Sequence, residues 1–500
     1  MASLEIPVLV GVSQHTQFKE SKELSDPIGL MIEAGRKAFD NTGVPLSRMA
    51  AAIDTVCVVN IFCWSYYQAP QMVAQGLGLS PANFVYTAIG GNTPQWLINQ
   101  YARSIAAGEC RAVLMTGAEA FYALRRMRKN GLENTWPAMV PPEKITGNNR
   151  EGTHALENHY DLFLPSFMYP LFETALRASS GRSVESHERF MANLYEKISR
   201  TASQNPYAWS REFLTAEQLL HNKTNRYIGY PYTMRMNANI DVDQSSAVLM
   251  TSEKVAASLG IEKSRWVYPL GGADFNNVWY VSSRPRLDDS PAIAQAATCA
   301  LTQAGLSIND IGIFDLYSCF PSAVQMAMHA LGLPENDPRP LSVTGGLAFF
   351  GGPGNNYTMH AIASVVEQIR QNRKMKALVT ANGWYNTKQA VGVYGNKPDT
   401  GTWQLSDNSP IQKNIDDQAL PEPQERASGV MTVEAYVIRH DRDDNPYLGT
   451  VIGRLENGRR ALAHIRADVS DLPGMEKNEL VGKSGRVVYD DRAGYNFVEF

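Results

Sequence analysis

The fold is decided by two stretches of the sequence, DPIGLMIEAGRKAFDNTGVPLSRMAAAIDTVCVVN (residues 26–60) and SPAIAQAATCALTQAGLSINDIGIFDLYSCF (residues 290–320). Each reads as a helix, a turn at a glycine, a short helix start and then an apolar strand. The two turn glycines, Gly43 and Gly305, lie 262 residues apart. Similarity at a fixed offset is the signature of a repeated unit, so the sequence predicts an α/β unit that occurs twice.

A second pair of stretches repeats at nearly the same offset. It joins IAAGECRAVLMTGAEAFY (residues 105–122) to IRQNRKMKALVTANGWY (residues 369–385), and aligning Ala112 with Ala377 gives an offset of 265 residues. Chance similarity of two helix-strand units is the alternative, and two matches at nearly one offset argue against it. The sequence therefore predicts an α/β protein made of two halves, residues 1–262 and 263–415.

The halves differ by a long insertion in the first one. Over a hundred residues rich in aromatic residues, Asn and Pro separate the strand-like run AVLMTGAE from the next run, DQSSAVLMTS. We place this insertion at about residues 120–235. An insertion of this length in a compact repeat is commonly a cap or a binding segment.

A third region follows the polar stretch LSDNSPIQKNIDDQALPEPQERASG, which is typical of a linker. From Val430 onward, short runs of alternating polarity are separated by Gly, Asn and Asp. This pattern is typical of a small all-β barrel or sandwich. We therefore assign residues 416–500 to a β-rich C-terminal domain.

Composition and charge exclude several classes of protein. The 500 residues are 44% apolar and 19% charged with a net charge of −4, which suits a well-buried globular protein and gives no electrostatic case for nucleic acid or an anionic membrane. No run approaches the roughly 20 apolar residues of a membrane-spanning helix. The N-terminus enters a strand-like run directly and does not read as a signal peptide, and the five cysteines form no CxxC pair. We expect a cytoplasmic protein with reduced, buried thiols.

Several strings resemble the thiolase superfamily, and in particular its sterol-carrier-protein-2 branch. NPYAWSREFLTAEQL (residues 205–219) is similar to the branch's Asn-Pro-Tyr segment, DQSSAVLMTSEKVA (residues 243–256) to its Asp-Gly-Ala-Ala strand entry, and YSCF (residues 317–320) to its His-Asp-Cys-Phe motif. GTVIGRLENGRRALAH (residues 449–464) resembles the OB-like domain associated with these thiolases. The resemblance implies a duplicated thiolase fold of five layers (αβαβα), a C-terminal OB-like domain, and the handling of acyl-CoA thioesters.

The groups that carry thiolase chemistry are missing from the matching positions. The family's acyl-accepting cysteine falls near Gly91, the histidine of its Gly-His-Pro motif on Gly352, and the cysteine of its Cys-x-Gly turn on Asn382, which Gly383 follows. Without a thiolate nucleophile, a covalent acyl-enzyme is not expected. The pattern resembles the thiolase-like proteins of type 1, which combine a degenerate site with an added C-terminal domain.

Four polar side chains are candidates for catalysis in what would remain of the acyl-CoA pocket. Tyr317 replaces a polar active-site residue of the family and would donate a hydrogen bond to a thioester oxygen, or act as an acid if its pKa were lowered. The alternative is a buried tyrosine satisfied by a backbone group. His360 would supply the lost imidazole if its loop folds back, or is an interior histidine. Asn382 and Tyr385 would hydrogen-bond an enolate-like oxygen.

Other residues are expected to bind substrate or to serve the fold. The substrate-binding positions implied by the resemblance are Gly91, Ser318, Gly352 and Gly383. Cys319 is expected to be a packed residue and not a nucleophile. The run RRMRK (residues 125–129) would meet the phosphates of CoA, or form a solvated helix face. No metal site is expected, since His154 and His159 are not placed as ligands.

These observations lead to one hypothesis and two alternatives. The hypothesis is a thiolase-like protein of lipid or steroid side-chain metabolism that binds an acyl-CoA or a related lipid thioester, needs no other cofactor, and is a monomer or homodimer. Whether it is an enzyme stays open. Its reaction would be non-covalent C–C cleavage of the retro-aldol or retro-Claisen type. The alternatives are an acetyl-CoA C-acyltransferase (acetyl-CoA acetyltransferase) with relocated residues and a non-catalytic binding or scaffold protein.

Overall fold

The strands of the first half form a five-stranded mixed sheet in the order β1-β7-β4-β2-β3. Its strands are β1 (Pro7–Thr16), β2 (Thr55–Val58), β3 (Asn83–Tyr86), β4 (Ala112–Ala120) and β7 (Asp243–Ser252). β2 runs parallel to β3 and β4, whereas β7 is antiparallel to β4 and β1. β4 and β7 are buried along their whole length because helices cover both faces of the sheet. The computed structural model describes residues 5–221, 224–398, 403 and 407–500.

The second half forms a four-stranded sheet in the order β8-β11-β10-β9. Its strands are β8 (Tyr268–Asn276), β9 (Ile313–Asp315), β10 (Ala377–Gly383) and β11 (Lys388–Gly395). β9 is parallel to β10, and β11 is antiparallel to both β10 and β8. The same directions relate β2, β4, β7 and β1 in the first sheet, which confirms that the α/β unit is duplicated.

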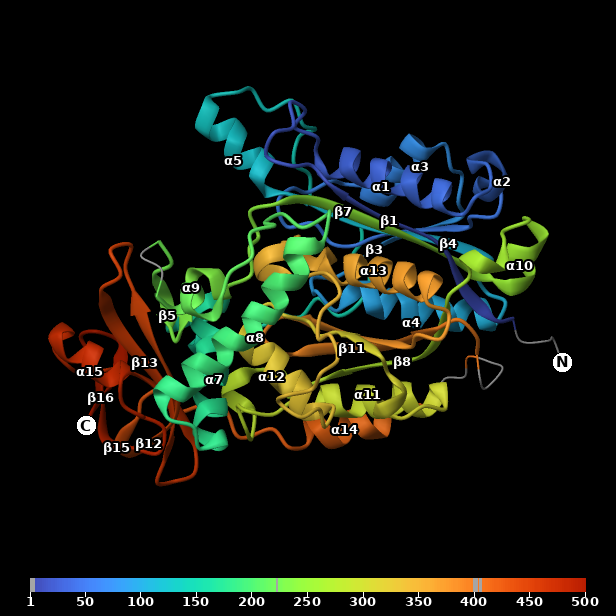
Figure 1. The fold of residues 1–500 in the computed structure, drawn as a ribbon. Coiled ribbons are helices and arrows are strands. Elements are labelled where there is room, and N and C mark those ends of the chain that lie inside the picture. Colours follow the sequence, from blue (N-terminus) through green and yellow to red (C-terminus); the bar gives the residue numbers. More distant parts are fainter. Residues whose placement is uncertain (1–4, 222–223, 399–402, 404–406) are drawn as a thin grey trace.

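Three layers of helices alternate with the two sheets (Figure 1). The outer face of the first sheet is covered by α1 (Pro27–Asn41), α2 (Leu46–Ala50) and α3 (Ala69–Leu77). The layer between the two sheets consists of α4 (Thr93–Ala106) and α13 (Tyr357–Gln371). The layer beyond the second sheet consists of α11 (Pro291–Ala304), α12 (Pro321–Ala330) and α14 (Ser409–Asp416). α13 is buried on nearly all sides, as a helix between two sheets must be. The predicted five-layer fold is confirmed.

The insertion contributes mainly helices; those within residues 165–221 lie between the layers and the C-terminal barrel, whereas the helix of residues 121–130 lies away from the barrel (Figure 1). Its elements are α5 (Phe121–Asn130), α6 (Ala155–His159), α7 (Pro165–Ser180), α8 (Val184–Gln204), α9 (Ala216–His221), β5 (Tyr227–Tyr230) and β6 (Tyr232–Thr233). The short helix α10 (Glu253–Ser258) follows β7. The long helix α8 packs on α9, and α7 contacts both α12 and the barrel.

The C-terminal strands close into a five-stranded ring. These are β12 (Ser428–His440), β13 (Pro446–Leu455), β14 (Arg460–Ile465), β15 (Ser484–Asp490) and β16 (Tyr495–Glu499), with α15 (Leu472–Glu476) between β14 and β15. The order β13-β14-β16-β15-β12 closes because β12 also pairs with β13, and β5 of the insertion adds to β12. A closed five-stranded β-domain of this kind is consistent with the OB-like domain that the resemblance implies.

The polar stretch before the barrel is not a linker throughout, contrary to the prediction. Residues Ser409–Asp416 form α14, whose first turn holds Pro410 and whose Ile415 is buried. Proline is tolerated in the first turn of a helix. Gln412 anchors the segment, because it accepts from the N–H of Asn276 at 2.7 Å and donates to the carbonyl of Asn276 at 2.9 Å. Residues 405 and 406 of that stretch lie outside the described residues.

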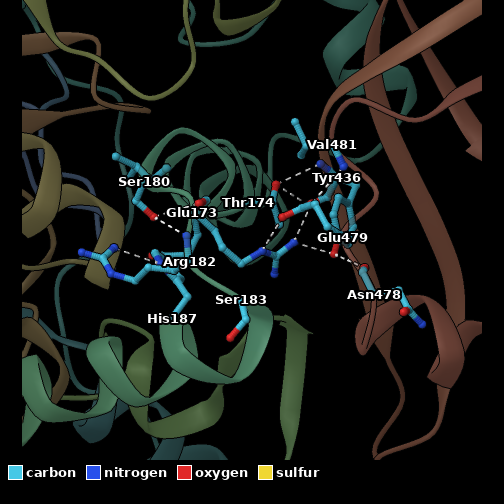
Figure 2. A network of polar contacts seen from close by, with 12 residues as sticks. Glu173, Thr174, Ser180, Arg182, Ser183, His187, Tyr436, Asn478, Glu479 and Val481 are labelled. Carbon is cyan, nitrogen blue, oxygen red and sulfur yellow. Dashed lines mark hydrogen bonds and ion pairs between the residues drawn. The ribbon is translucent and has the colours of Figure 1, made fainter.

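A buried polar network fixes the barrel to α7 (Figure 2). Arg177 donates to both carboxylate oxygens of Glu479, at 2.8 and 3.0 Å, and to the hydroxyl of Tyr436 at 2.7 Å. Thr174 exchanges two hydrogen bonds with the backbone of Tyr436, at 3.0 and 3.1 Å. Since a two-pronged guanidinium-carboxylate bond is strong and directional, the barrel is held to the insertion in one orientation.

Candidate functional site

The corner between β9 and α12, which carries the YSCF string, faces a cavity of about 290 Å³. Five of the residues expected at the site line this cavity together: Gly91, Tyr317, Gly352, Asn382 and Tyr385. They come from the start of α4, the end of β9, the loop before α13 and the turn after β10. The structure therefore brings together loops from both halves of the duplicated fold.

The loop that begins α4 has no room for a side chain at Gly91. A Cβ atom built there clashes with the hydroxyl oxygen of Tyr317 and lies 2.6 Å from the carbonyl oxygen of Asn382. The loop itself is fixed, because Gly90 donates its N–H to Asn355 Oδ1 at 2.8 Å and Thr358 donates to the carbonyl of Gly91 at 3.0 Å. The hydroxyl of Tyr317 thus occupies the volume that a nucleophilic side chain at position 91 would need.

Tyr317 is held by its backbone and leaves its hydroxyl free. Its N–H donates to Thr380 Oγ1 at 2.9 Å, and its ring packs edge-on against Tyr357 with centroids 5.5 Å apart. Within the described part of the chain the hydroxyl has no hydrogen-bond partner. Burial raises the pKa of Tyr317, and the neighbouring Cys319 adds to the shift. The raised pKa keeps the phenol protonated, so the side chain is a neutral hydrogen-bond donor at the wall of the cavity. A general acid near neutral pH would need a lowered pKa, which Tyr317 does not have.

The loop that begins α13 is roomier at the matching glycine. Gly352 donates its N–H to the carbonyl of Asn239 at 2.8 Å. A Cβ atom built on Gly352 lies 3.4 Å from that carbonyl oxygen and 3.4 Å from Leu347 Cδ2, which is ordinary van der Waals contact. Position 352 therefore lacks an imidazole but has space for the beginning of a side chain.

Asn382, at the end of β10, has both polar atoms of its side chain bonded, to residues of α7 and β11. Its Nδ2 donates to the hydroxyl of Tyr169 at 3.0 Å, and its Oδ1 accepts a bond from Gln389 at 3.3 Å. Tyr169 in turn donates to the carbonyl of Trp384 at 3.0 Å. Tyr385 donates its hydroxyl to the carbonyl of Phe163. Of the lining candidates, Tyr317 alone has a free polar group among the described residues.

His360 is not brought to the cavity. It lies on α13, is fully buried, and its Nδ1 is 3.2 Å from Gln14 Oε1. Its ring packs against Phe350 at 5.1 Å between centroids. Burial lowers the pKa of His360 to about 3, so the imidazole is neutral at physiological pH. The loop before α13 does not fold back far enough to place this histidine where the family's imidazole would be.

Ser318 and Gly383 lie behind the cavity wall and do not line it. Ser318 is fully buried, and its carbonyl accepts a bond from Tyr195 at 3.2 Å. A Cβ atom on Gly383 would clash with Oδ1 of Asn92, so this glycine is required by close packing of the turn against the α4 loop. Both residues shape the site without facing it.

Cys319 does line the cavity, as the one thiol that does so among the described residues. Burial raises its pKa to about 12, and its Sγ lies 3.9 Å from Asn382 Nδ2. A thiol that stays protonated is a poor nucleophile. The environment of Cys319 therefore agrees with a packed residue.

Aromatic side chains complete the cavity, and sequence reasoning missed them. They are Phe62, Phe163, Tyr169, Phe320 and Trp384. Tyr169 on α7 stacks on Phe320 with centroids 4.4 Å apart. Two of them, Phe163 and Tyr169, lie in the aromatic-rich insertion. The composition of the insertion indicates a binding segment but does not indicate which of its aromatic residues face a ligand.

Charged groups are absent from this cavity lining among the described residues. The basic helix α5 lies beside it: Arg125 donates to Asp241 at 2.9 Å, and the adjacent Ile240 lines the cavity. Arg126 donates to the carbonyls of Lys19 and Ser21. The described residues hold no cluster of three or more His, Cys, Asp or Glu side chains suited to a metal ion. None of the helices in the described ranges is both long and apolar enough to cross a membrane.

Two comparisons with known sequences point to thiolases. A family model described as "Thiolase-like protein type 1 additional C-terminal domain" matches residues 410–492. The chain is also 24% identical over 196 residues to the benzoylsuccinyl-CoA thiolase subunit BbsB of Thauera aromatica. That match covers 36% of this chain and 49% of the relative, so the chain spans about half the length of this curated relative.

Solved structures agree with this relationship. An Ltp2-ChsH2(DUF35) aldolase has 17% identity and a TM-score of 0.60, covering 79% of this chain and 98% of that one, which shows a shared fold. A monomeric SCP2-thiolase like protein type 1 from Mycobacterium smegmatis is 33% identical with a TM-score of 0.85, covering 100% of this chain and 99% of that one. Identity at this level over the whole length, together with the C-terminal match, establishes that the chain belongs to the SCP2-thiolase-like proteins of type 1.

Proposed function

We propose that this protein binds a lipid thioester without forming a covalent bond to it. The acyl group lies in the cavity of about 290 Å³, and the hydroxyl of Tyr317 donates a hydrogen bond to the thioester carbonyl. The observation that carries the proposal is the unpartnered Tyr317 hydroxyl at the place where a side chain on Gly91 would stand. An unsatisfied donor in an apolar wall favours a ligand that brings an acceptor.

The lining supports an acyl group more than a nucleotide. Aromatic and aliphatic residues dominate it, and the described lining holds no Lys or Arg that would neutralise phosphates. The volume suits an acyl chain and a thioester, whereas the phosphates of a CoA carrier would stay outside. Lys388, whose Nζ donates to the carbonyl of the lining residue Ile89 at 2.6 Å, and the exposed Arg128 and Lys129 of α5 are candidates to meet them.

A second candidate function is cleavage of a C–C bond next to the thioester. In a 3-hydroxyacyl thioester the C2–C3 bond would break, water would take the proton of the 3-hydroxyl group, and an aldehyde or ketone would leave. A neutral donor on the thioester carbonyl oxygen would stabilise the enolate that remains, which then takes a proton from water. In a 3-ketoacyl thioester, water or free CoA would have to attack the 3-keto carbon and carry away the acyl fragment. A relocated acyltransferase is less well supported, because Cys319 keeps its thiol protonated with a pKa of about 12. A protein that only holds its ligand, or serves as a scaffold, is the remaining alternative.

Calorimetric titration with octanoyl-pantetheine and octanoyl-CoA tests the binding proposal. We expect saturable binding of both, and a loss of about fivefold in affinity in Tyr317→Phe, since one hydrogen bond contributes about 1 kcal/mol. Tyr447→Phe, which changes an exposed tyrosine on the barrel, is the matched control and should bind as the parent does. Absence of binding for both thioesters would refute the proposal.

Incubation with panels of 3-hydroxyacyl-CoA and 3-ketoacyl-CoA separates the catalytic candidates. Release of a shortened acyl-CoA that depends on Tyr317 would support C–C cleavage. Binding without turnover of any member would leave a binding protein, and an acetyl group on Cys319 would support the acyltransferase.

We also propose that the protein is monomeric and located in the cytoplasm. The free edge of the first sheet at β3 is partly covered, because Thr146 donates to the carbonyl of Tyr86 and accepts from the N–H of Ala88, each at 2.8 Å. A covered edge hinders strand pairing with a second copy. Light scattering on the purified chain should give the mass of one copy.

A further inference from the structure

A second cavity, of about 450 Å³, lies between the insertion and the second half. Its walls come from the end of α7, the start of α8, α12 and the segment after α12. It shares no lining residue with the cavity at Tyr317. Its size falls within the range of small-molecule sites, and the proposed function does not use it.

One guanidinium in this cavity is held firmly from behind. Arg182 stacks over the ring of Phe190 at 4.1 Å. Its Nη1 lies 3.3 Å from Nδ1 of His187 (Figure 2). His187 is buried, and its Nε2 lies 2.6 Å from the buried carboxylate of Glu173. Glu173 also accepts bonds from Gln325 at 2.5 Å and from Tyr232 at 2.6 Å. This buried chain of contacts fixes the orientation of the arginine before any ligand arrives.

The present anionic partner of this guanidinium is exposed. Arg182 pairs with Glu335 on the segment after α12; the side chain of Arg182 is 18% exposed and that of Glu335 is 64% exposed. A pair with one solvated partner contributes little to stability, because holding a long side chain costs entropy and water competes for the charge. A ligand anion can therefore replace Glu335 at small cost, and Arg182 keeps its position.

The rest of the lining combines an apolar wall with polar groups, of which Ser179, Ser180 and Gln325 already donate to protein oxygen atoms. Leu176, Met328 and Leu333 are buried on its walls. The only buried carboxylate in the described lining is that of Asp288, which accepts two bonds from Arg286 at 3.1 and 2.6 Å. One fixed cation beside an apolar wall suits a ligand with one anionic head and an apolar chain.

We propose that this cavity binds an amphipathic monoanion, with a carboxylate head on Arg182 and an alkyl chain along Leu176, Met328 and Leu333. The guanidinium matches a carboxylate in a two-pronged arrangement. A phosphate monoester offers related oxygen atoms to the same group, so the test includes it. The proposal does not depend on the thioester site.

Titration of the whole chain with decanoate, decyl phosphate and decanol, all below their micelle concentrations, tests it. We expect saturable binding of decanoate, and a loss of tenfold or more in Arg182→Gln, because a charge-assisted bond is removed. Glu335→Gln should instead bind decanoate twofold to fivefold more tightly, since the competing carboxylate is gone. Shortening the chain should weaken binding by about fourfold per methylene.

Controls separate this site from unspecific uptake. Arg189→Gln removes an exposed arginine of α8 that pairs with Glu217 outside the cavity, and it should change nothing. If Arg182→Gln does not fold, two other variants still test the proposal. Glu335→Gln should tighten decanoate binding, and Met328→Trp, which fills the cavity, should abolish it. Tighter binding of decyl phosphate with the same dependence on Arg182 would support the site and assign a phosphate head. Equal affinity for decanol and decanoate, or decanoate binding that neither Arg182→Gln nor Glu335→Gln alters, would overturn the proposal.

Discussion

The loops that begin α4 and α13 occupy equivalent places in the two halves, yet the space around their glycines differs. At Gly91 the volume for a side chain is filled by Tyr317 and by the carbonyl of Asn382, whereas at Gly352 it is open to ordinary contacts. In the first half another residue has taken over the place of a nucleophile. In the second half a side chain is simply missing. The packing around Gly91 therefore excludes a cysteine side chain there, whereas the packing around Gly352 does not exclude a histidine side chain.

Gly91→Cys should have the largest effect. The new side chain meets Tyr317 and the backbone of Asn382, so we expect the free energy of unfolding to fall by about 3 kcal/mol. Urea denaturation measures the change. The double variant Gly91→Cys/Tyr317→Phe should recover part of the loss, but not all, because Cζ of residue 317 and the Asn382 carbonyl stay in place. A stable Gly91→Cys protein would show that the loop is not as crowded as we describe.

Tyr169→Phe should come next, with a loss of about 2 kcal/mol in the free energy of unfolding. Its hydroxyl bonds to Asn382, to the carbonyl of Trp384 and, at 3.3 Å, to the N–H of Asn386, and these partners would be left unpaired. Tyr317→Phe is the matched control, since its hydroxyl has no partner among the described residues and its loss should change stability by less than about 0.5 kcal/mol. Equal losses in the two variants would contradict the assignment of the free donor.

Gly352→His should be tolerated, with a loss of less than about 1 kcal/mol in thermal or urea unfolding. The reason is the open space beside Asn239 and Leu347. The comparison with Gly91→Cys is the informative measurement, because both variants place a thiolase residue at its matching position. If Gly352→His were as destabilising as Gly91→Cys, the contrast between the two loops would be lost.

The smallest expected effect is the slow alkylation of the Cys319 thiol in the parent protein. Its pKa of about 12 lies above the usual value, so the reactive thiolate is scarce at pH 8 and grows about tenfold per pH unit, without a plateau below pH 10. Mass mapping after iodoacetamide treatment measures the rate, and the half-buried Cys299 of α11 is the internal control that should react faster. A plateau near neutral pH would mean an activated thiol and would favour acyl transfer.

Much of the fold followed from the sequence because its signals are local and repeated. The offset between Gly43 and Gly305 predicted the duplication, and alternating runs after Val430 predicted the barrel strands. The polar composition of the stretch that contains α14 predicts a linker instead of a helix. The buried Ile415 and the two hydrogen bonds between Gln412 and the backbone of Asn276 hold this segment as a helix, and these contacts are not visible in its composition.

The site was only partly accessible from the sequence. Motif matching located Gly91, Gly352 and Asn382, because their positions are set by the order of loops and strands in the fold. The contact between Tyr169 and Asn382 joins residues 213 positions apart, and no local pattern reports it. The direction in which the His360 side chain points depends on how α13 is rotated about its axis between the two sheets. Because α13 is apolar on nearly all sides, the spacing of its residues does not reveal this rotation.

The turn after β10 also escaped sequence reasoning. Trp384 and Asn386 both have positive φ, at 58° and 57°, a conformation usually left to glycine. Tertiary contacts enforce it, since Tyr169 bonds to the backbone of both residues. This conformation fixes the side of the cavity that Trp384 and Tyr385 line.

The most direct test of the central claim is the ¹³C NMR signal of a thioester labelled at its carbonyl carbon, recorded on the bound ligand. We expect one thioester resonance shifted downfield relative to free ligand in the parent protein, with the shift lost in Tyr317→Phe, because the hydroxyl donates to that oxygen. A resonance of an acyl group attached to the protein, or a downfield shift that persists unchanged in Tyr317→Phe, would contradict the claim.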